Sequence, residues 1–379
     1  MNRAGDTHVA QVIGNLGIGG AMKLTAQVTL GVKRATGRAS VCVLGRAGHY
    51  GVELRKHGVE VMELGLTRGP WAAAKWLNAV ARLRRWLRES QVDVVHSHMT
   101  FSGLATVMAN AGLGLPHVRT LHRKFQAYKA FQVPLERFIA ASTTRYVVDS
   151  RAVRSLLQQE FGIDRSIEVI YNGIDSQEFA AAPDRNAARE ALRIHRDDWV
   201  AGSIAFFVAE KGHRVLLEAF ARAFAGAPRT RLVLVGHGPL QEHLRGLAGA
   251  LGIGERVLWI PTTPELSSIY PALDVFTLVS SWEGFGIVQA EAMWFGLPVI
   301  GTRGGGAMEV VEDGVTGLLN LFGDVEGVAR ALRLMFENRD TAREMWRRGR
   351  ERVEKQFNLQ CTIRRYLELY EEMWSVRQR

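Results

Sequence analysis

Residues 273–309 read LDVFTLVSSWEGFGIVQAEAMWFGLPVIGTRGGGAME. The apolar run at 275–279 is short and β-branched, which predicts a buried strand. Residues 287–294 have helical spacing, and a glycine and a proline end that helix before a second buried strand at 298–301. This strand leads into three glycines at 304–306. We therefore predict a strand–loop–helix–strand unit whose glycine loops share one sheet edge, where α/β proteins bind nucleotides.

Two carboxylates in this segment indicate the chemistry that it supports. Glu283 lies in the loop before the predicted helix, and Glu291 lies eight residues later, inside it. The first amides of a helix lack partners and carry partial positive charge, so a diphosphate fits between the two acids. Each carboxylate can then accept hydrogen bonds from hydroxyls, with sugar on one side and ribose on the other. The alternative is that both are solvated helix residues. The residues expected to approach the diphosphate are Gly284, Phe285, Gly286 and Ile287.

The same segment carries a resemblance to a known family. SWEGFGIVQAEAMWFGLPVIGT at 281–302, followed by GGAMEVVEDGVTGLL at 305–319, closely resembles the donor-site motif of family-four retaining glycosyltransferases. That resemblance implies the GT-B fold, an α/β architecture of two Rossmann-like domains facing across a cleft. We expect an acceptor-side domain at 1–178, a nucleotide-sugar domain at 179–355, and a last helix at 356–379 that returns to the first domain.

The resemblance also implies roles for residues outside the segment. His122 in RTLHRKF matches a family histidine that contacts the donor sugar, and Lys211 matches a lysine that binds the donor diphosphate. Gly236 and Gly238 match the turn that lines the nucleotide site. The family arginine five positions before the lysine is here Phe206, and we expect Arg303 to substitute for it.

Glycines also follow the first predicted strand, at residues 8–13. The loop GNLGIGGAMK places Gly19 and Gly20 before a helix, where a ligand can approach the backbone. It is not a complete dinucleotide-binding fingerprint, and a tight turn without a ligand is the alternative.

No metal ion or cofactor is expected, apart from the nucleotide sugar as co-substrate. The chain has no Asp-x-Asp motif, and the spacing of His96, His98 and His122 is not a zinc pattern. We expect His96 and His98 to point to opposite faces of their strand, which leaves one of them structural. The phosphate charge would then be balanced without magnesium or manganese.

The charge of the chain is concentrated in its first half. Residues 1–178 hold 23 Lys and Arg against 13 Asp and Glu, whereas the remainder holds 25 of each. This asymmetry indicates an anionic partner for the first domain, such as a phospholipid surface, a phosphorylated acceptor or nucleic acid. Basic residues mix with aromatics in a predicted helix at 70–89 and again at 123–131, as in interfacial helices. A solvated surface and an ordinary crossover helix are the alternatives.

Further features bound the location and the function. The chain has two cysteines, no signal-like apolar region and no run of about 18 apolar residues, so we expect a cytoplasmic protein, peripheral on the inner membrane face at most. No nucleic-acid-binding signature occurs, and nucleic acid is not an expected partner. We predict a retaining, metal-independent glycosyltransferase that moves a sugar from a UDP-sugar to a cell-envelope glycan or lipid-linked acceptor, such as lipopolysaccharide core. The alternatives are a soluble acceptor and a non-catalytic nucleotide-sugar binder.

Overall fold

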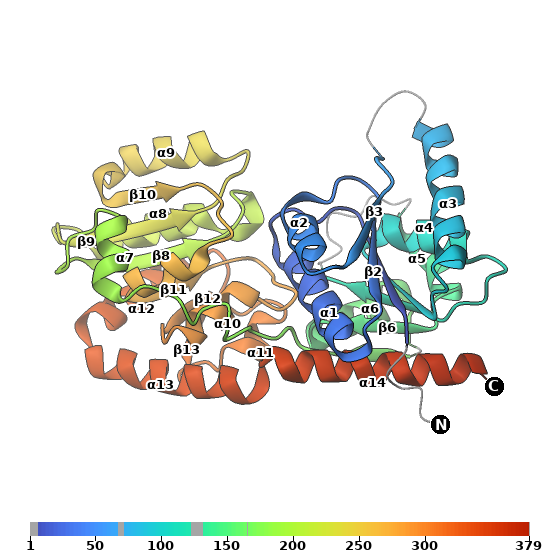
Figure 1. Cartoon of the computed structure of the whole chain (residues 1–379). Helices are drawn as coiled ribbons and strands as arrows, with labels where there is room; N and C mark the ends of the chain where they lie inside the picture. The colour runs from blue at the N-terminus through green and yellow to red at the C-terminus, as the bar shows by residue number, and fades with distance from the viewer. Residues whose placement is uncertain (1–6, 67–71, 123–131, 165, 379) are drawn as a thin grey trace. The chain divides into compact units, whose positions relative to one another are not determined.

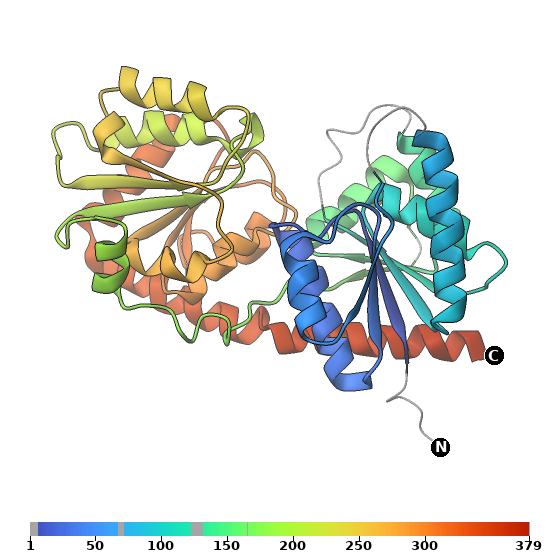
Figure 2. The ribbon, with the colours of Figure 1, turned by 45° about the horizontal axis from the view of Figure 1, so that its top comes forward.

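The computed structural model describes residues 7–66, 72–122, 132–164 and 166–378 (Figure 1). Two compact units result: Met1–Gly173 with Gln360–Arg379, and Ile174–Leu359. Each unit is built around one parallel β-sheet with helices on both faces (Figures 1 and 2). The chain thus leaves the first unit once and returns to it with its last helix.

The first unit contains a seven-stranded sheet of order β3-β2-β1-β4-β5-β6-β7. Its strands are β1 (Val9–Ile13), β2 (Ala39–Val43), β3 (Glu60–Glu63), β4 (Val94–His98), β5 (His117–Leu121), β6 (Arg145–Val148) and β7 (Ile167–Val169). Its helices are α1 (Gly20–Thr36), α2 (Gly48–Lys56), α3 (Ala72–Glu89), α4 (Thr100–Asn110), α5 (Gln132–Ala141), α6 (Arg151–Phe161) and α14 (Leu359–Gln378). Because every pairing is parallel, all loops that follow the strands gather at one edge.

Two layers of side chains cover this sheet. Helices α3 and α4 pack on the face that presents Ala10 and Val12 of β1. The opposite face presents Val9, and there α1 packs together with Tyr366 and Tyr370 of α14. The aromatic side chains of α14 are therefore part of the core of the first unit, although they lie more than 350 residues after β1 in the sequence.

The second unit contains a six-stranded parallel sheet of order β10-β9-β8-β11-β12-β13. Its strands are β8 (Trp199–Ile204), β9 (Thr230–Val235), β10 (Val257–Ile260), β11 (Val275–Leu278), β12 (Val299–Thr302) and β13 (Gly317–Asn320). Its α-helices are α7 (Arg185–Ala191), α8 (His213–Ala223), α9 (Gln241–Ala250), α10 (Ile287–Trp294), α11 (Ala307–Val310), α12 (Val325–Glu337) and α13 (Arg339–Gln356). Short 3₁₀ turns complete it: η3 (Ala209–Lys211), η4 (Gly254–Arg256), η5 (Leu266–Ser268) and η6 (Tyr270–Ala272).

The structure shows where β8 ends and leaves two predicted segments untested. Strand β8 ends at Ile204, and the amide of Phe207 donates to the His237 carbonyl in the neighbouring loop at 2.7 Å. Phe206 therefore belongs to a loop. The basic and aromatic segment at 123–131, and Trp71 at the start of the predicted helix, lie outside the described residues. Of the helices that the structure describes, none combines the length and the apolarity needed to cross a membrane.

Candidate active site

An ion pair between two loops of the second unit forms the centre of the candidate site. Lys211 ends the η3 turn, and Glu283 lies in the loop between β11 and α10. The amide of Ser281 donates to the Glu210 carbonyl at 2.7 Å, which holds the two loops side by side. Lys211 Nζ then lies 2.6 Å from Glu283 Oε1, with the two side chains 27% and 13% exposed. The structure thus brings together the two residues that were predicted to contact the diphosphate and the sugar.

Helix α10 begins four residues after Glu283, and its first turn has the features of an anion-binding site. Gly286 precedes the helix with φ 93°, a conformation that favours glycine, and no side chain caps the helix. The amides of Gln289 and Ala290 bond to the Gly286 carbonyl. The preceding amides, at Ile287 and Val288, are the ones that an α-helix leaves without internal acceptors. Their donors and the helix dipole can bind a negatively charged group.

The glycines at 304–306 pack against the backbone of this loop. The amide of Gly306 donates to the Glu283 carbonyl at 2.8 Å. A Cβ atom on Gly305 would lie 2.1 Å from the Glu283 carbonyl oxygen, and one on Gly306 would lie 1.9 Å from the Gly284 carbonyl oxygen. Only glycine allows this backbone contact, so these glycines position Glu283.

Glu291 is held inside the unit by a residue that sequence reasoning missed. The hydroxyl of Tyr270 donates to Glu291 Oε2 at 2.8 Å, and both residues are buried. Burial and the nearby carboxylate raise the pKa of Tyr270 well above its usual range, so its hydroxyl keeps its proton. No sequence pattern marks Tyr270, because it lies in a short 3₁₀ turn, 21 residues before Glu291.

Gln289 is a second residue that the sequence did not reveal. It is fully buried in the first turn of α10, and neither its Oε1 nor its Nε2 has a hydrogen-bond partner. Its amide group fills the space that side chains on Gly286 and Gly301 would otherwise occupy. A buried amide without partners is costly and is uncommon in folded proteins.

Phe206 and the Gly236–Gly238 turn lie at the same sheet edge. A Cβ on Gly236 would lie 2.0 Å from the Ala205 carbonyl oxygen, and one on Gly238 would lie 2.5 Å from that of Phe207. These glycines let the loops after β8 and β9 touch. Phe206 is 45% exposed and meets the His237 ring edge to face, at a centroid distance of 4.7 Å.

Arg303 does not join this group of residues in the structure. Its guanidinium pairs with Asp313 at 2.6 Å, and its Nε donates to the Leu319 carbonyl at 3.3 Å. A role as substitute for the arginine replaced by Phe206 would require Arg303 to leave Asp313, and that role stays a prediction.

The remaining predicted residues belong to the first unit. Gly19 caps the start of α1, and Gly20 is the first residue of that helix. His122 follows β5, and its side chain is 5% exposed. Burial lowers the pKa of His122 to about 4, so the imidazole is neutral at physiological pH.

The expectation that His96 and His98 point to opposite faces is wrong. Side chains two positions apart in a strand share a face, and the two rings lie 4.3 Å apart between centroids. His98 Nδ1 is 3.1 Å from His122 Nε2. Both histidines of β4 are thus buried beside His122. Across the part of the chain that the structure describes, no three His, Cys, Asp or Glu side chains gather in a way that could hold a metal ion.

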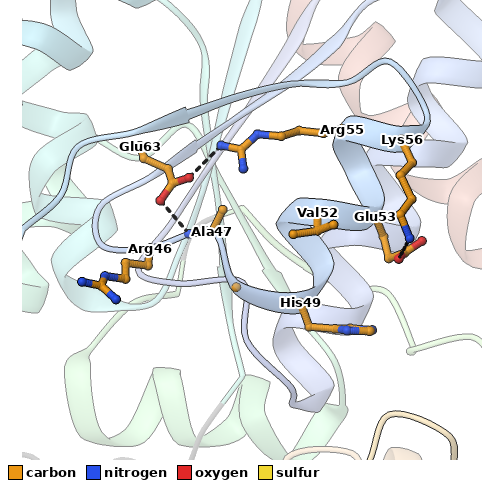
Figure 3. Close-up of a pocket in the computed structure, with 9 residues that line it drawn as sticks. Arg46, Ala47, His49, Val52, Glu53, Arg55, Lys56 and Glu63 are labelled. Atoms are coloured by element: carbon orange, nitrogen blue, oxygen red, sulfur yellow. Dashed lines mark hydrogen bonds and ion pairs between the residues drawn. The ribbon is translucent and has the colours of Figure 1, made fainter.

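A hollow of ≈ 640 Å³ lies at the start of α2, in the first unit (Figure 3). Lys56 is paired with Glu53, and Arg55 with Glu63, while Arg46 and His49 also line the hollow. A Cβ on Gly48 would lie 2.9 Å from the Gly17 Cα. The hollow therefore adjoins the glycine loop that follows β1, at the edge where strands β1, β2 and β3 end.

Two family models match the chain. The model described as Glycosyl transferases group 1 matches residues 184–352, and the model described as Glycosyltransferase Family 4 matches residues 18–178. The first match lies within the second unit, and the second match lies within the first unit except for residues 174–178.

Individual proteins show the same likeness. N-acetyl-alpha-D-glucosaminyl L-malate synthase of Bacillus anthracis is 26% identical over 300 residues, which cover 78% of each chain. GDP-mannose-dependent alpha-(1-6)-phosphatidylinositol monomannoside mannosyltransferase of Mycolicibacterium smegmatis is 33% identical over 192 residues, 48% of this chain and 50% of that protein. The structure of Anabaena HepE in complex with UDP and glucose aligns with a TM-score of 0.86 at 21% identity, over 96% of this chain and 100% of that one. This likeness confirms the predicted GT-B fold class.

Proposed function

Because this chain belongs to the family 4 glycosyltransferases, we propose that it transfers a sugar from a nucleoside diphosphate sugar to an acceptor hydroxyl, and that the nucleoside diphosphate is UDP. The observation that carries this proposal is the Lys211–Glu283 pair at the uncapped start of α10. An ammonium group, a carboxylate and helical amides in one place suit a diphosphate bonded to a sugar.

Leaving-group stabilisation is the first task of this site. Negative charge accumulates on the diphosphate as the sugar–phosphate bond breaks. The ammonium of Lys211 has three N–H donors, and the bond to Glu283 uses one of them. The other two can donate to the diphosphate, and the amides at Ile287 and Val288 are fixed dipoles that require little rearrangement when the charge develops.

Sugar positioning is the second task. Glu283 would accept hydrogen bonds from sugar hydroxyls, Glu291 would accept from the ribose, and His122 would contact the far side of the sugar. Lys211 already occupies one oxygen of Glu283, so this carboxylate suits an orienting role better than a nucleophilic one. We infer departure and attack on one face of the sugar, which retains the anomeric configuration, without a metal ion.

An anionic acceptor is supported by charge and by the relatives. The first half of the chain carries all of the excess positive charge, and the hollow at α2 presents Arg46 and His49. The names of the two relatives specify malate and phosphatidylinositol monomannoside, both of which are anionic. We therefore propose a phosphorylated or lipid-linked envelope acceptor, lipopolysaccharide core included, reached from the cytoplasmic membrane face. The malate-acting relative supports a soluble anionic acceptor as the second candidate.

A donor screen tests the proposal first. Purified protein is incubated with UDP-, GDP- and ADP-sugars, and release of the nucleoside diphosphate is measured with and without EDTA. One base should give turnover that EDTA does not abolish and that Lys211→Met reduces at least about 100-fold. Absence of release with every donor, or loss of activity in EDTA, would contradict the corresponding part of the proposal.

Acceptor binding is tested with vesicles and small anions. Binding to vesicles of anionic phospholipid at low salt, and not to neutral vesicles, supports the membrane-linked acceptor. Equal binding to both compositions, with transfer to a soluble anionic acceptor, favours the second candidate.

A further inference from the structure

A line of hydrogen bonds connects His122 to the C-terminal helix within the first unit. His122 Nε2 lies 3.1 Å from His98 Nδ1, and His98 Nε2 lies 2.7 Å from Gln11 Oε1. Gln11 Nε2 in turn donates to the Tyr370 hydroxyl at 3.2 Å. The line runs from the end of β5 across β4 and β1 to α14, which lies against this sheet (Figure 2).

The geometry of the two histidines is that of a hydrogen bond in the ring plane. The His98 and His122 rings are inclined by only 12°, with centroids 5.4 Å apart. This separation exceeds the 3.1 Å between their nitrogens by about two ring radii, so the rings lie edge to edge and do not overlap. One nitrogen must therefore donate and the other must accept.

Burial fixes the number of protons in this line. His98 is 2% exposed, and burial together with the neighbouring imidazoles lowers its pKa well below the usual range. Burial likewise lowers the pKa of His122 to about 4. Each neutral ring then has one N–H donor and one bare nitrogen, so the state of one ring decides the state of the next.

The orientation of Gln11 gives the line its direction. Its carbonyl oxygen faces His98 Nε2, so that nitrogen carries the proton and His98 Nδ1 is bare. His122 Nε2 must then donate to His98 Nδ1. The Tyr370 hydroxyl accepts from Gln11 and can donate to His96 Nδ1, which lies 2.6 Å away. His96 Nε2 then donates to the Thr120 hydroxyl at 2.7 Å.

We propose that Gln11 and His98 are positioning residues that hold His122 in the tautomer with the proton on Nε2 and a bare Nδ1. His122 Nδ1 lies 4.0 Å from Asp149 Oδ2, beyond hydrogen-bond range, so that nitrogen can accept a bond from a ligand. The sugar group that meets it must be a hydroxyl that donates. This last step rests on the proposed function, whereas the tautomer does not.

Nitrogen-15 NMR of histidine-labelled protein without any ligand tests the tautomer. His122 should show a protonated Nε2 and a bare Nδ1, and its signals are assigned from a His122→Asn sample. In Gln11→Leu, which removes the acceptor for His98, the His122 signals should shift toward a mixture of the two tautomers. His117→Gln is the matched control, because it changes a buried histidine of β5 that bonds to Ser97, outside this line.

Binding of deoxyfluoro donor sugars tests the consequence. Fluorine cannot donate a hydrogen bond, so replacing the hydroxyl at His122 should weaken wild-type binding about fivefold, the effect of one net buried hydrogen bond. The loss should be smaller in Gln11→Leu and unchanged in His117→Gln.

Two NMR results would overturn the inference: a proton on His122 Nδ1 in the wild-type protein, or His122 signals that Gln11→Leu leaves unchanged. If the spectra agree but no donor is turned over, the tautomer assignment stands and the proposed function fails.

Discussion

Opposite substitutions in the Lys211–Glu283 pair should move nucleoside diphosphate affinity in opposite directions. The pair is neutral as a whole, with its charged atoms 2.6 Å apart at the start of α10. Glu283→Gln leaves a net positive charge beside the diphosphate, Lys211→Met leaves a net negative one, and the double variant is again neutral. The sign of each effect follows from Coulomb's law alone.

The size of the effect follows from the exposure of the pair. The side chains are 27% and 13% exposed, so the interaction is weaker than in a fully buried pair and stronger than on an open surface. Charged hydrogen bonds contribute about 1.5–3 kcal/mol when buried and about 0.2–1 kcal/mol when exposed. An intermediate value of about 1–2 kcal/mol corresponds to roughly 5- to 30-fold in affinity.

Calorimetric titration with UDP, GDP and ADP provides the assay. Glu283→Gln should bind the preferred diphosphate roughly 5- to 30-fold more tightly yet turn over its donor more slowly, because the sugar loses an orienting carboxylate. Lys211→Met should bind more weakly by a similar factor, and the double variant should lie near wild type.

Glu218→Gln serves as the matched control, because it breaks the exposed Arg214–Glu218 pair on α8 and should change neither quantity. If both single variants weaken binding, or neither changes it, the diphosphate does not bind beside this pair.

Three further predictions concern Gln289, Phe206 and the buried histidines. Gln289→Leu should raise the free energy of unfolding by about 1–3 kcal/mol in a urea titration, because it removes a buried amide without partners; a less stable variant would mean that the amide is bonded. Phe206→Arg should tighten diphosphate binding about tenfold by adding a charge-assisted bond, and an unchanged dissociation constant would place Phe206 away from the phosphates. The first unit should unfold more readily at pH 5.5 than at pH 7.5, because burial lowers the pKa of His117 to about 3, that of His122 to about 4, and those of His96 and His98 well below the usual range. The unfolded chain binds more protons below pH 6.5, so this contribution to the free energy of unfolding is complete above that pH and falls by about 1.4 kcal/mol per histidine at pH 5.5. Pulse proteolysis in urea measures the stability of each unit. The second unit should lose less stability, because among the described residues its buried histidine of lowered pKa is His213.

The sequence of the second unit predicted the local structure around Glu283 well, because that structure lies in one continuous segment. Apolar runs at 275–279 and 298–301 are short enough to be strands, and the helix between them has clear limits. Glu283 and the start of α10 are therefore adjacent in the sequence as well as in space. Lys211 was found only through the family resemblance, since nothing in its own neighbourhood marks it as a partner of Glu283.

Contacts between distant segments could not be predicted. Tyr270 meets Glu291 through the packing of a short 3₁₀ turn that has no periodicity. Gln11 meets Tyr370 across 359 positions, and only the return of α14 to the first sheet brings them together. The shared face of His96 and His98, in contrast, follows from strand alternation alone, because side chains two positions apart in a strand lie on the same side.

The contacts of the glycines at 304–306 could not be predicted from the sequence either. A loop rich in glycine at a sheet edge suggests contact with a ligand, whereas here the missing side chains make room for the Glu283 and Gly284 backbone. The glycines in the sequence indicate that the backbone approaches another group closely, and the structure shows that this group is the neighbouring loop backbone.

A crystal structure of the protein with its donor diphosphate tests the central claim most directly. The account predicts diphosphate oxygens within hydrogen-bond distance of the amides at Ile287 and Val288 and of Lys211 Nζ, with Glu291 on the ribose. A diphosphate bound anywhere else, with the start of α10 left to solvent, would contradict it.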